Sequence, residues 1–342
     1  MIRYLFALLL LLFLCVTEAA VCQPRYDSTK SKYIEQFSDK FFIWPVIRKR
    51  SLSFDVTNQS TKQTINYKPN SSFSLGVGIY LFEVAAEITF AIPIDEKNQS
   101  TYGNTDAREF HANFLGNGWG MDVFRQKYSG FYFPIRSPSS PDVFVKRPDI
   151  ELTNTGVNGI YVFDKKRFSL KSAYNYSERQ IKSGGSFIMA GNLNMFRLNA
   201  DSVITSKQNS QPSSTSDFQL MRYTTLSMAG GYTYTLVYRS FFLNGTLSIG
   251  PAHNWIAYNR PGEQEHYDIA INTYSDARVA LGYNSDRFFG GMSLVTQSRN
   301  IRFENIKFAN TNTFVKLMLG YRFNEVGILK KRARDYIPRN NP

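Results

Sequence analysis

The chain has 342 residues, with 40 Lys and Arg against 27 Asp and Glu, a formal net charge of +13, and 43% hydrophobic and 15% aromatic residues. This composition excludes intrinsic disorder, and the periods of collagen or coiled-coil repeats are lacking. Its 2 cysteines are too few for a disulfide framework or for a zinc site of four cysteines. A folded, aromatic-rich protein remains.

The N-terminal residues have the pattern of a secretory signal peptide. One positive charge, Arg3, precedes an unbroken apolar run over Leu5–Val16. The run is shorter than the roughly 20 residues that a membrane-spanning helix requires, which disfavours the alternative of an N-terminal anchor. Small residues at Ala20 and Cys22 predict cleavage after residue 22, and a second cleavage site follows Ala19. Cleavage after residue 22 removes both cysteines.

The remainder of the chain contains no apolar stretch of roughly 18 residues, so any further membrane crossing requires β-strands, whose sign is a two-residue alternation. In the N-terminal half, six segments are typical of strands: Leu52–Thr57, Gln63–Tyr67, Ser72–Tyr80, Val84–Ile92, Arg108–Leu115 and Trp119–Phe133. The proline-rich residues 134–148 fit either a loop or a further strand.

In the C-terminal half, the alternation is clearest in Thr313–Phe323. Its apolar face holds Val315, Leu317, Leu319, Tyr321 and Phe323, and its other face holds Lys316, Met318, Gly320 and Arg322. Six earlier segments follow the same pattern: Phe168–Glu178, Ser186–Leu198, Tyr223–Tyr238, Phe241–Ala252, Ile269–Tyr283 and Phe288–Arg299. We expect an even total of about 12 strands, within a range of about 10 to 14.

The polar faces of these segments distinguish a membrane barrel from a soluble β-sandwich. A sandwich exposes its polar faces to water and fills them with long charged side chains. Here the polar faces are rich in Gly, Ser, Thr and Asn, which suit a confined lumen, and tyrosines such as Tyr238 and Tyr283 lie near strand ends, as in the aromatic girdles of membrane barrels. The sequence therefore predicts an all-β fold, an antiparallel transmembrane β-barrel, with the sandwich as the alternative.

The connections predict how the barrel is oriented. Short turns at residues 239–240 and 284–287 alternate with longer polar segments at residues 201–217, 259–266 and 300–312, as periplasmic turns alternate with external loops. The expected organisation is a signal peptide over residues 1–22, a periplasmic segment over 23–49, a barrel over 50–323 and a basic C-terminal tail over 324–342.

Several runs resemble a Bacteroidota family catalogued as domain of unknown function 4421: Trp119-Gly-Met-Asp122, Lys127-Tyr-Ser-Gly-Phe-Tyr132, Tyr161-Val-Phe163 with Phe168-Ser169, and Glu178-Arg-Gln-Ile-Lys-Ser-Gly-Gly-Ser186. The resemblance covers about Lys32 to Phe323. It implies an outer-membrane β-barrel of unassigned activity and supplies no catalytic residues. The family-motif residues are Trp119, Gly120, Asp122, Gly130, Gln180, Lys182, Ser183, Gly185 and Ser186.

The closing run Gly320-Tyr-Arg-Phe323 resembles the terminal strand signal that the barrel-assembly machinery reads, which ends on an aromatic residue. It departs from that pattern because residues 324–342 follow the phenylalanine. On this resemblance the assembly machinery is an expected partner during insertion.

Few residues support catalysis or metal binding. Of the 3 histidines, His111, His253 and His266, none is followed two residues later by serine, which disfavours the lipid hydrolases that place both on one strand face. His266 and Asp268 share one face near an expected external loop. We interpret them as a chance pair of surface residues rather than as a protease site. Metalloprotease, nucleophile-elbow and phosphate-loop motifs do not occur. We expect no catalytic residues, no metal and no cofactor.

The charge surplus and the location decide the expected partners. A secreted chain meets little nucleic acid, so we expect outer-membrane lipid instead, with basic residues near the outer loops contacting lipopolysaccharide phosphates. The charged lumen candidates are Asp276, Arg278, Lys316 and Arg322. The sequence favours a structural or narrow, porin-like solute-passing barrel of the bacterial cell outer membrane, which takes a small solute if the lumen is open. The alternatives are an outer-membrane lipid or peptide hydrolase and the secreted sandwich.

Overall fold

The computed structural model describes residues 29–37, 39–81, 84–137, 140–204, 218–260 and 262–325. The expected signal peptide, both cysteines and the tail beyond residue 325 lie outside the described residues. The elements in chain order are η1 (Lys30–Lys32), β1 (Ile34–Gln36), β2 (Lys40–Asn58), β3 (Thr64–Tyr67), β4 (Phe73–Leu81), β5 (Val84–Ala91), α2 (Glu96–Tyr102), β6 (Asp106–Leu115), β7 (Trp119–Ser137), β8 (Ser140–Val162), α3 (Leu170–Tyr174), β9 (Glu178–Gln180), β10 (Gly184–Ile204), β11 (Phe218–Tyr238), β12 (Phe241–Asn259), β13 (His266–Asn284), β14 (Phe288–Phe303) and β15 (Ile306–Asn324).

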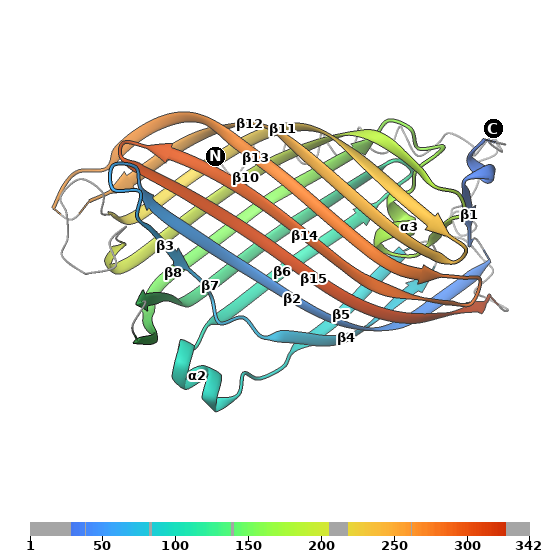
Figure 1. The fold of residues 1–342 in the computed structure, drawn as a ribbon, viewed down its shortest axis with the longest axis horizontal. Helices are drawn as coiled ribbons and strands as arrows, with labels where there is room; N and C mark the ends of the chain where they lie inside the picture. The colour runs from blue at the N-terminus through green and yellow to red at the C-terminus, as the bar shows by residue number, and fades with distance from the viewer. Residues whose placement is uncertain are drawn as a thin grey trace, which may run out of the picture.

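One antiparallel sheet forms the wall of an all-β barrel (Figure 1). Its path of 12 strands runs β5-β4-β2-β15-β14-β13-β12-β11-β10-β8-β7-β6. The last strand, β15, pairs with the first long strand, β2, so the chain returns to its beginning as a barrel requires. The predicted fold class and strand number are confirmed. A sandwich would consist of two packed sheets, whereas the described strands form this one sheet and the small β1–β9 pair.

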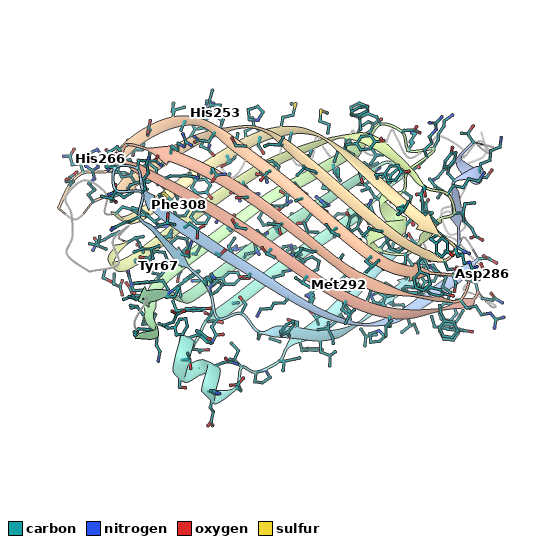
Figure 2. The ribbon with its side chains drawn as sticks, viewed as in Figure 1. Tyr67, His253, His266, Asp286, Met292 and Phe308 are labelled. Carbon is teal, nitrogen blue, oxygen red and sulfur yellow. The ribbon has the colours of Figure 1, made fainter. Side chains whose placement is uncertain are left out.

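The wall changes its construction where the path ends, between β5 and β6. Among the described residues, β5 pairs only with β4 and β6 only with β7. We call the end of the barrel with the β12–β13 connection the loop end and the opposite end the turn end (Figure 2). Nearer to the loop end than the β5–β6 gap, which we call the seam, the backbone groups of Lys68 and Tyr132 exchange two hydrogen bonds of 2.9 Å each, which join the residue after β3 to β7. Gly130 forms a bulge in β7; it has φ of +90°, and a Cβ there would lie 2.3 Å from the carbonyl oxygen of Asn104, in the segment before β6.

The two faces of the wall have opposite character. Large apolar side chains project outward in the half of the barrel near the short turns, including Leu75, Ile88, Leu236, Leu281 and Leu319. An outward apolar surface in a folded barrel is the arrangement of membrane-spanning barrels. We call it the apolar band. Beyond the band, towards His266 in Figure 2, the outward side chains of β14 and β15 are polar. Among the described residues, no helix is both long and apolar enough to cross a membrane.

Most strands are longer than the sequence predicted, because they continue past the band, whereas β4 and β5 have only 9 and 8 residues. A crossing needs about 9 to 11 residues, whereas β8 spans 23 and β15 spans 19. Residues 300–312, expected as a loop, belong to β14 and β15, which leave only Glu304 and Asn305 as the turn. Of the proline-rich residues 134–148, residues 134–137 belong to β7 and residues 140–148 to β8, and the two strands pair. Polar residues occur on both faces of these strand segments, so the two-residue alternation of apolar and polar residues is not visible in their sequence.

Two further differences arise where apolar residues face the interior. The barrel begins at Lys40 and not at residue 50, since Phe42, Trp44 and Val46 are buried inside while their neighbours on β2 point outward. Both faces are apolar here, which hides the two-residue period. Residues 168–178, expected as a strand, instead hold α3, and the Oγ atom of Ser169 caps its first turn by accepting from the backbone N–H of Ser172 at 3.1 Å.

The apolar band can be tested by two substitutions on one face of β15. The Leu319 side chain points outward and is 65% exposed. We expect Leu319→Arg to lower the free energy of unfolding by about 2–4 kcal/mol, because it places a charge in hydrocarbon. Thr311→Arg, on the same face but beyond the band, should lower it by no more than about 1 kcal/mol. Urea titrations in lipid vesicles measure both, and equal losses would contradict the position of the band.

The orientation can be tested by labelling cysteines on intact cells. Gln264 and Asp286 are exposed at opposite ends of the barrel, in the β12–β13 and β13–β14 connections. We expect a membrane-impermeant maleimide to label Gln264→Cys on whole cells, and to label Asp286→Cys only after the cells are opened. The unlabelled wild type is the control once residues 1–22 are removed. The reverse pattern would show an inverted barrel.

Candidate functional site: the interior charge network

The middle of the interior is lined by small polar side chains that bond to one another. Asn158 accepts from the amide of Asn192 at 2.6 Å, and Thr225 donates to Asn254 at 2.6 Å. Asn and Thr combine hydrogen-bond donors and acceptors in short side chains, so polar side chains on neighbouring strands can form all their hydrogen bonds with one another, without water. The predicted small polar lining is therefore buried and internally hydrogen-bonded. Its hydrogen-bonded members include Asn154, Asn194, Thr233, Thr235, Asn244 and Thr246.

Two of the predicted lumen residues, Asp276 and Arg278, form a closed ion pair. They lie two apart on β13, so both point inward. The guanidinium of Arg278 donates from Nε to Oδ1 of Asp276 at 2.7 Å and from Nη2 to Oδ2 at 2.8 Å. Gln297 donates to the same carboxylate at 2.8 Å and accepts from Asn158 at 3.2 Å. The bonds thus cross the interior from β13 and β14 to β8.

Lys316, the third predicted residue, makes a separate brace. Its Nζ atom lies 3.0 Å from Oε1 of Glu87 on β5 and donates to the backbone oxygen of Tyr174, at the end of α3, at 3.3 Å. Trp44 donates to Glu87 at 3.1 Å and Arg48 lies 3.9 Å from it. One carboxylate therefore connects three strands. No ring of free positive charge is built from Lys316.

Arg322, the fourth, lies at the turn end of the barrel and holds the segment after α3. Its guanidinium stacks over the rings of Phe37, Phe42 and Phe289 at 3.9, 4.9 and 4.6 Å from their centroids. It donates to the backbone oxygen of Tyr176 at 2.6 Å and to Oδ1 of Asn284 at 2.7 Å. Arg322 therefore anchors an interior plug rather than lining a passage.

That plug consists of η1, β1, α3 and β9. Its buried carboxylate, Glu178, lies 3.1 Å from Nζ of Lys30 and accepts from Gln36 at 3.0 Å and from Ser169 at 2.5 Å. Apolar side chains fill the space around it, and Met318, expected among the polar lumen residues, is one of them. The cluster consists of Phe37, Phe42, Trp44, Val46, Tyr80, Ala173, Tyr176, Phe242, Ala280, Phe289 and Met318.

The family-motif residues of the last run support this plug. The amide of Gln180 donates to the backbone oxygens of Arg167 and Lys182 at 2.6 and 3.0 Å. Ser183 accepts from the backbone of Val237 at 2.9 Å, and Ser186 accepts from that of Asp164 at 2.8 Å. A Cβ on Gly185 would lie 2.5 Å from the backbone oxygen of Thr233 on β11, so a larger residue would push the strands apart.

The other family-motif residues lie on β7. Trp119 points outward at the turn end, Gly120 is buried beside it, and Gly130 is the bulge described above. Asp122 belongs to a cluster that the sequence did not predict. Its Oδ1 atom lies 3.4 Å from Nδ1 of His111 on β6.

This unpredicted cluster bridges the seam. Nη1 of Arg50, on β2, lies 3.2 Å from Nδ1 of His111, and its Nε lies 3.7 Å from Oε2 of Glu109. Glu109 also accepts from Gln126 at 3.1 Å and from the hydroxyl of Tyr128. The two-residue alternation in residues 108–115 places Glu109 and His111 on the face opposite Phe110 and Phe114. From this alternation the sequence could have predicted that both polar side chains point inward. The partner on β2 could not be inferred from it.

The other candidate chemistry is not assembled. His266 points its Nε2 atom at Glu263, 2.8 Å away, and stacks on Tyr258, while Asp268 accepts from the next backbone N–H at 2.7 Å. The expected His266–Asp268 pair therefore does not form a bonded unit. Within the described ranges, no group of three or more His, Cys, Asp or Glu residues is placed to hold a metal ion.

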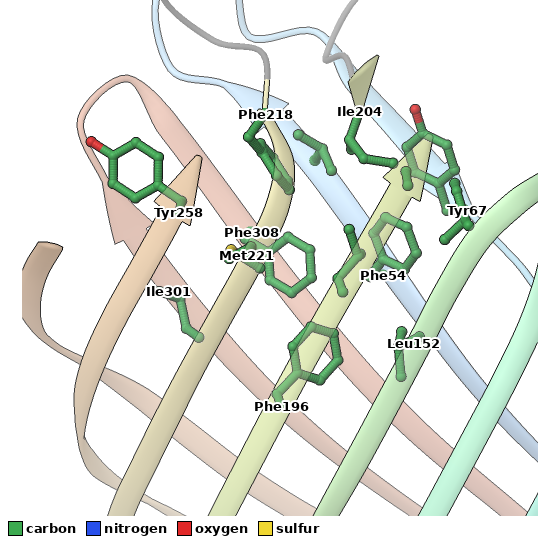
Figure 3. Close-up of a cluster of buried hydrophobic side chains, with 14 of the residues drawn as sticks. Phe54, Tyr67, Leu152, Phe196, Ile204, Phe218, Met221, Tyr258, Ile301 and Phe308 are labelled. Atoms are coloured by element: carbon green, nitrogen blue, oxygen red, sulfur yellow. The ribbon is translucent and has the colours of Figure 1, made fainter. Parts of the chain in front are cut away.

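The loop end of the interior is filled by a second apolar cluster (Figure 3). Phe54 stacks on Tyr67 at 4.7 Å between centroids and on Phe308 at 5.5 Å, and Phe308 meets Phe196 across the interior at 5.6 Å. These rings come from four strands and meet on the axis. Further members are Leu52, Val56, Ile65, Leu152, Leu198, Ile204, Phe218, Met221, Tyr223, Ile256, Ile301, Phe303 and Ile306.

Comparison with known proteins gives a family and low-scoring structural similarities. A family model described as domain of unknown function (DUF4421) matches residues 25–323. No curated protein matches. Among solved structures, the outer membrane protease OmpT from Escherichia coli is 10% identical with a TM-score of 0.41, over 84% of this chain and 98% of that one. The β-domain of the Bordetella autotransporter BrkA is 10% identical with a TM-score of 0.35, over 84% and 100%.

The plug carboxylate provides a test of the site. We expect Glu178→Gln to lower the free energy of unfolding by about 1–3 kcal/mol, because hydrogen bonds to a buried charge are replaced by weaker ones. Glu151→Gln is the matched control, since Glu151 pairs with Lys127 at 2.8 Å on the outward face. An exposed pair contributes less than about 1 kcal/mol. Urea titration compares them, and a larger loss for the control would contradict the role of Glu178.

Proposed function

Since the chain belongs to the family described as domain of unknown function (DUF4421), we propose that it acts as a closed structural barrel of the bacterial outer membrane. The proposal includes the Bacteroidota origin that the sequence resemblance implies, and export directed by residues 1–22. The outward apolar band supports the membrane location, because such a surface is stable only in contact with lipid.

The observation that carries the proposal is the packing of both ends of the interior. At the loop end the rings of Phe54, Phe196 and Phe308 meet across the axis. At the turn end Arg322 clamps the plug against Phe42 and Phe289. Side chains in such contact leave no passage for a hydrated solute, since interiors pack as densely as organic crystals.

The charges in the middle of the interior support the same reading. A selective pore presents unpaired charges of one sign to the passing ion. Here Arg278 is held by both oxygens of Asp276, and Lys316 faces Glu87. Lys316 of β15 and Glu87 of β5 join two strands directly. Gln297 of β14 bonds to the Asp276 carboxylate that Arg278 holds on β13. The interior network therefore acts as bracing between strands. The alternative, a barrel that passes solute, is tested by the conductance measurement described next.

Planar-bilayer recordings and thermal unfolding together test this function. We expect no conductance from the wild type or from Arg278→Gln/Lys316→Gln, and a loss in the free energy of unfolding of about 3 kcal/mol or more in the variant, because the buried carboxylate of Asp276 loses its cationic partner and the half-buried carboxylate of Glu87 loses Lys316. Arg302→Gln/Lys307→Gln, an outward pair in direct register on β14 and β15, is the control and should unfold like the wild type.

Two results would overturn the proposal. Stepwise wild-type currents whose anion preference disappears in the double variant would establish a pore. Hydrolysis of vesicle lipid to fatty acid, or cleavage of an added peptide, by vesicles that carry the purified protein would establish the hydrolase alternative.

A further inference from the structure

A row of basic side chains crosses the outward face of the barrel. Backbone register places Arg108 of β6 opposite Lys127 of β7, and Lys127 opposite Thr153 of β8. The same row continues through Arg197 of β10 to Arg222 of β11. Neighbouring strands are about 4.8 Å apart, so four basic residues lie within roughly 19 Å. The neighbours of Lys127, Arg197 and Arg222 along their strands are buried, which leaves these three side chains pointing outward, and the side chain of Arg108 is 79% exposed.

The row follows the edge of the apolar band that faces the loop end. On β6 the next outward residue towards the turns is Phe110, on β10 it is Met195, and on β11 Leu226 follows after one threonine. Arg125 of β7 lies one step nearer to the band, opposite Phe110. On β14 and β15 the first outward residues beyond the band are Thr296 and Thr313. The band edge on β14 and β15 therefore carries no basic residue.

The positive charge of the row is only partly compensated. Arg108 lies 3.1 Å from Asp106, Lys127 lies 2.8 Å from Glu151, and Arg222 lies 2.6 Å from Glu265. In the part of the chain that the structure describes, Arg125 and Arg197 have no carboxylate within ion-pair distance.

Arg197 and Arg222 also stand directly opposite each other on paired strands. Like charges in that position destabilise a sheet. An anion bound between the two guanidinium groups removes the repulsion. Arg302 and Lys307 oppose each other in the same way beside the β14–β15 turn, away from the apolar band. Arg197 and Arg222 instead lie at the edge of the band, where an anionic ligand would meet the hydrocarbon region.

We propose that this basic row binds the phosphate groups of the glycolipid of the outer leaflet, lipopolysaccharide, and the inference rests on the outer-membrane location proposed above. Guanidinium groups match phosphate oxygens in a two-pronged geometry. The residues below the row, Phe110, Met195 and Leu226, offer an apolar surface to the acyl chains of the same molecule. Phosphate and acyl contacts together distinguish a phosphorylated glycolipid from a soluble anion.

Titration of the purified full-length protein in neutral detergent with diphosphorylated lipid A tests the inference. The change in tryptophan emission reports binding, since Trp255 points outward opposite Thr224, beside the row, whereas Trp44 is buried and Trp119 lies at the turn end. We expect Arg125→Gln/Arg197→Gln to weaken the binding by about tenfold or more, because each lost contact to a charged group is worth at least that factor. The outward control Arg302→Gln/Lys307→Gln should bind within about twofold of the wild type.

The ligand is tested in parallel. Dephosphorylated lipid A should bind the wild type about as weakly as diphosphorylated lipid A binds the double variant. Equal binding of the phosphorylated and dephosphorylated forms, or equal binding by wild type and double variant, would overturn the inference. Binding of phosphatidylglycerol as tightly as lipid A would also overturn it, by showing a general anionic site.

Two further measurements keep the test decisive. Heat-modifiable gel migration shows whether each variant is folded. If the glutamine variant is not folded, Arg125→Lys/Arg197→Lys replaces it, because this variant keeps the positive charges and removes the two-pronged guanidinium groups. Weakened binding by the lysine variant then supports the inference, and unchanged binding contradicts it. Bilayer conductance is independent of this binding, so failure of the closed-barrel function would appear as wild-type current with lipid A affinity intact.

Discussion

A strand that crosses a membrane has one face in lipid, and an apolar side chain gains no hydrophobic free energy by leaving lipid for a contact with protein. Side-chain contacts that hold this barrel together must therefore lie on the inward face. The inward positions of β8, β10 and β12 carry hydrogen-bonding amides and hydroxyls, and those of β2 and β15 carry aromatic rings at the loop end. The interior contacts decide both the stability of the wall and whether anything can pass through it.

The same constraint explains the division of the interior into three zones. Hydrogen bonds between Asn158, Gln297 and Asp276 are strong only where water is excluded, and the apolar clusters at both ends exclude it. The clusters in turn need the polar middle, because small side chains such as Thr246 and Gly156 let the wall stay narrow enough for rings to meet at its ends. Plug, braces and ring cluster therefore depend on one another.

Sequence alone predicted the parts of this structure that depend on local pattern. The lipid face of β15 and the Asp276–Arg278 pair follow from a period of two along one strand. Lys316 with Glu87, and Arg50 with His111, join strands distant in sequence, and nothing local encodes such partners. Phe42 and Trp44 hid β2 because an apolar plug makes the inward face as hydrophobic as the outward one. The cap at Ser169 was the overlooked sign of α3.

The seam beside β5 and β6 has a mechanical consequence. Elsewhere around the wall, lateral tension in the membrane passes from strand to strand through ladders of backbone hydrogen bonds. At the seam it passes through the Lys68–Tyr132 bridge, the bonds from Asn70 to Thr105 and Gly103, and side-chain contacts such as those of Arg50, with no strand ladder among the described residues. A cylinder under tangential load yields along its least-connected line, so stretching or thinning of the bilayer parts this wall first between β5 and β6.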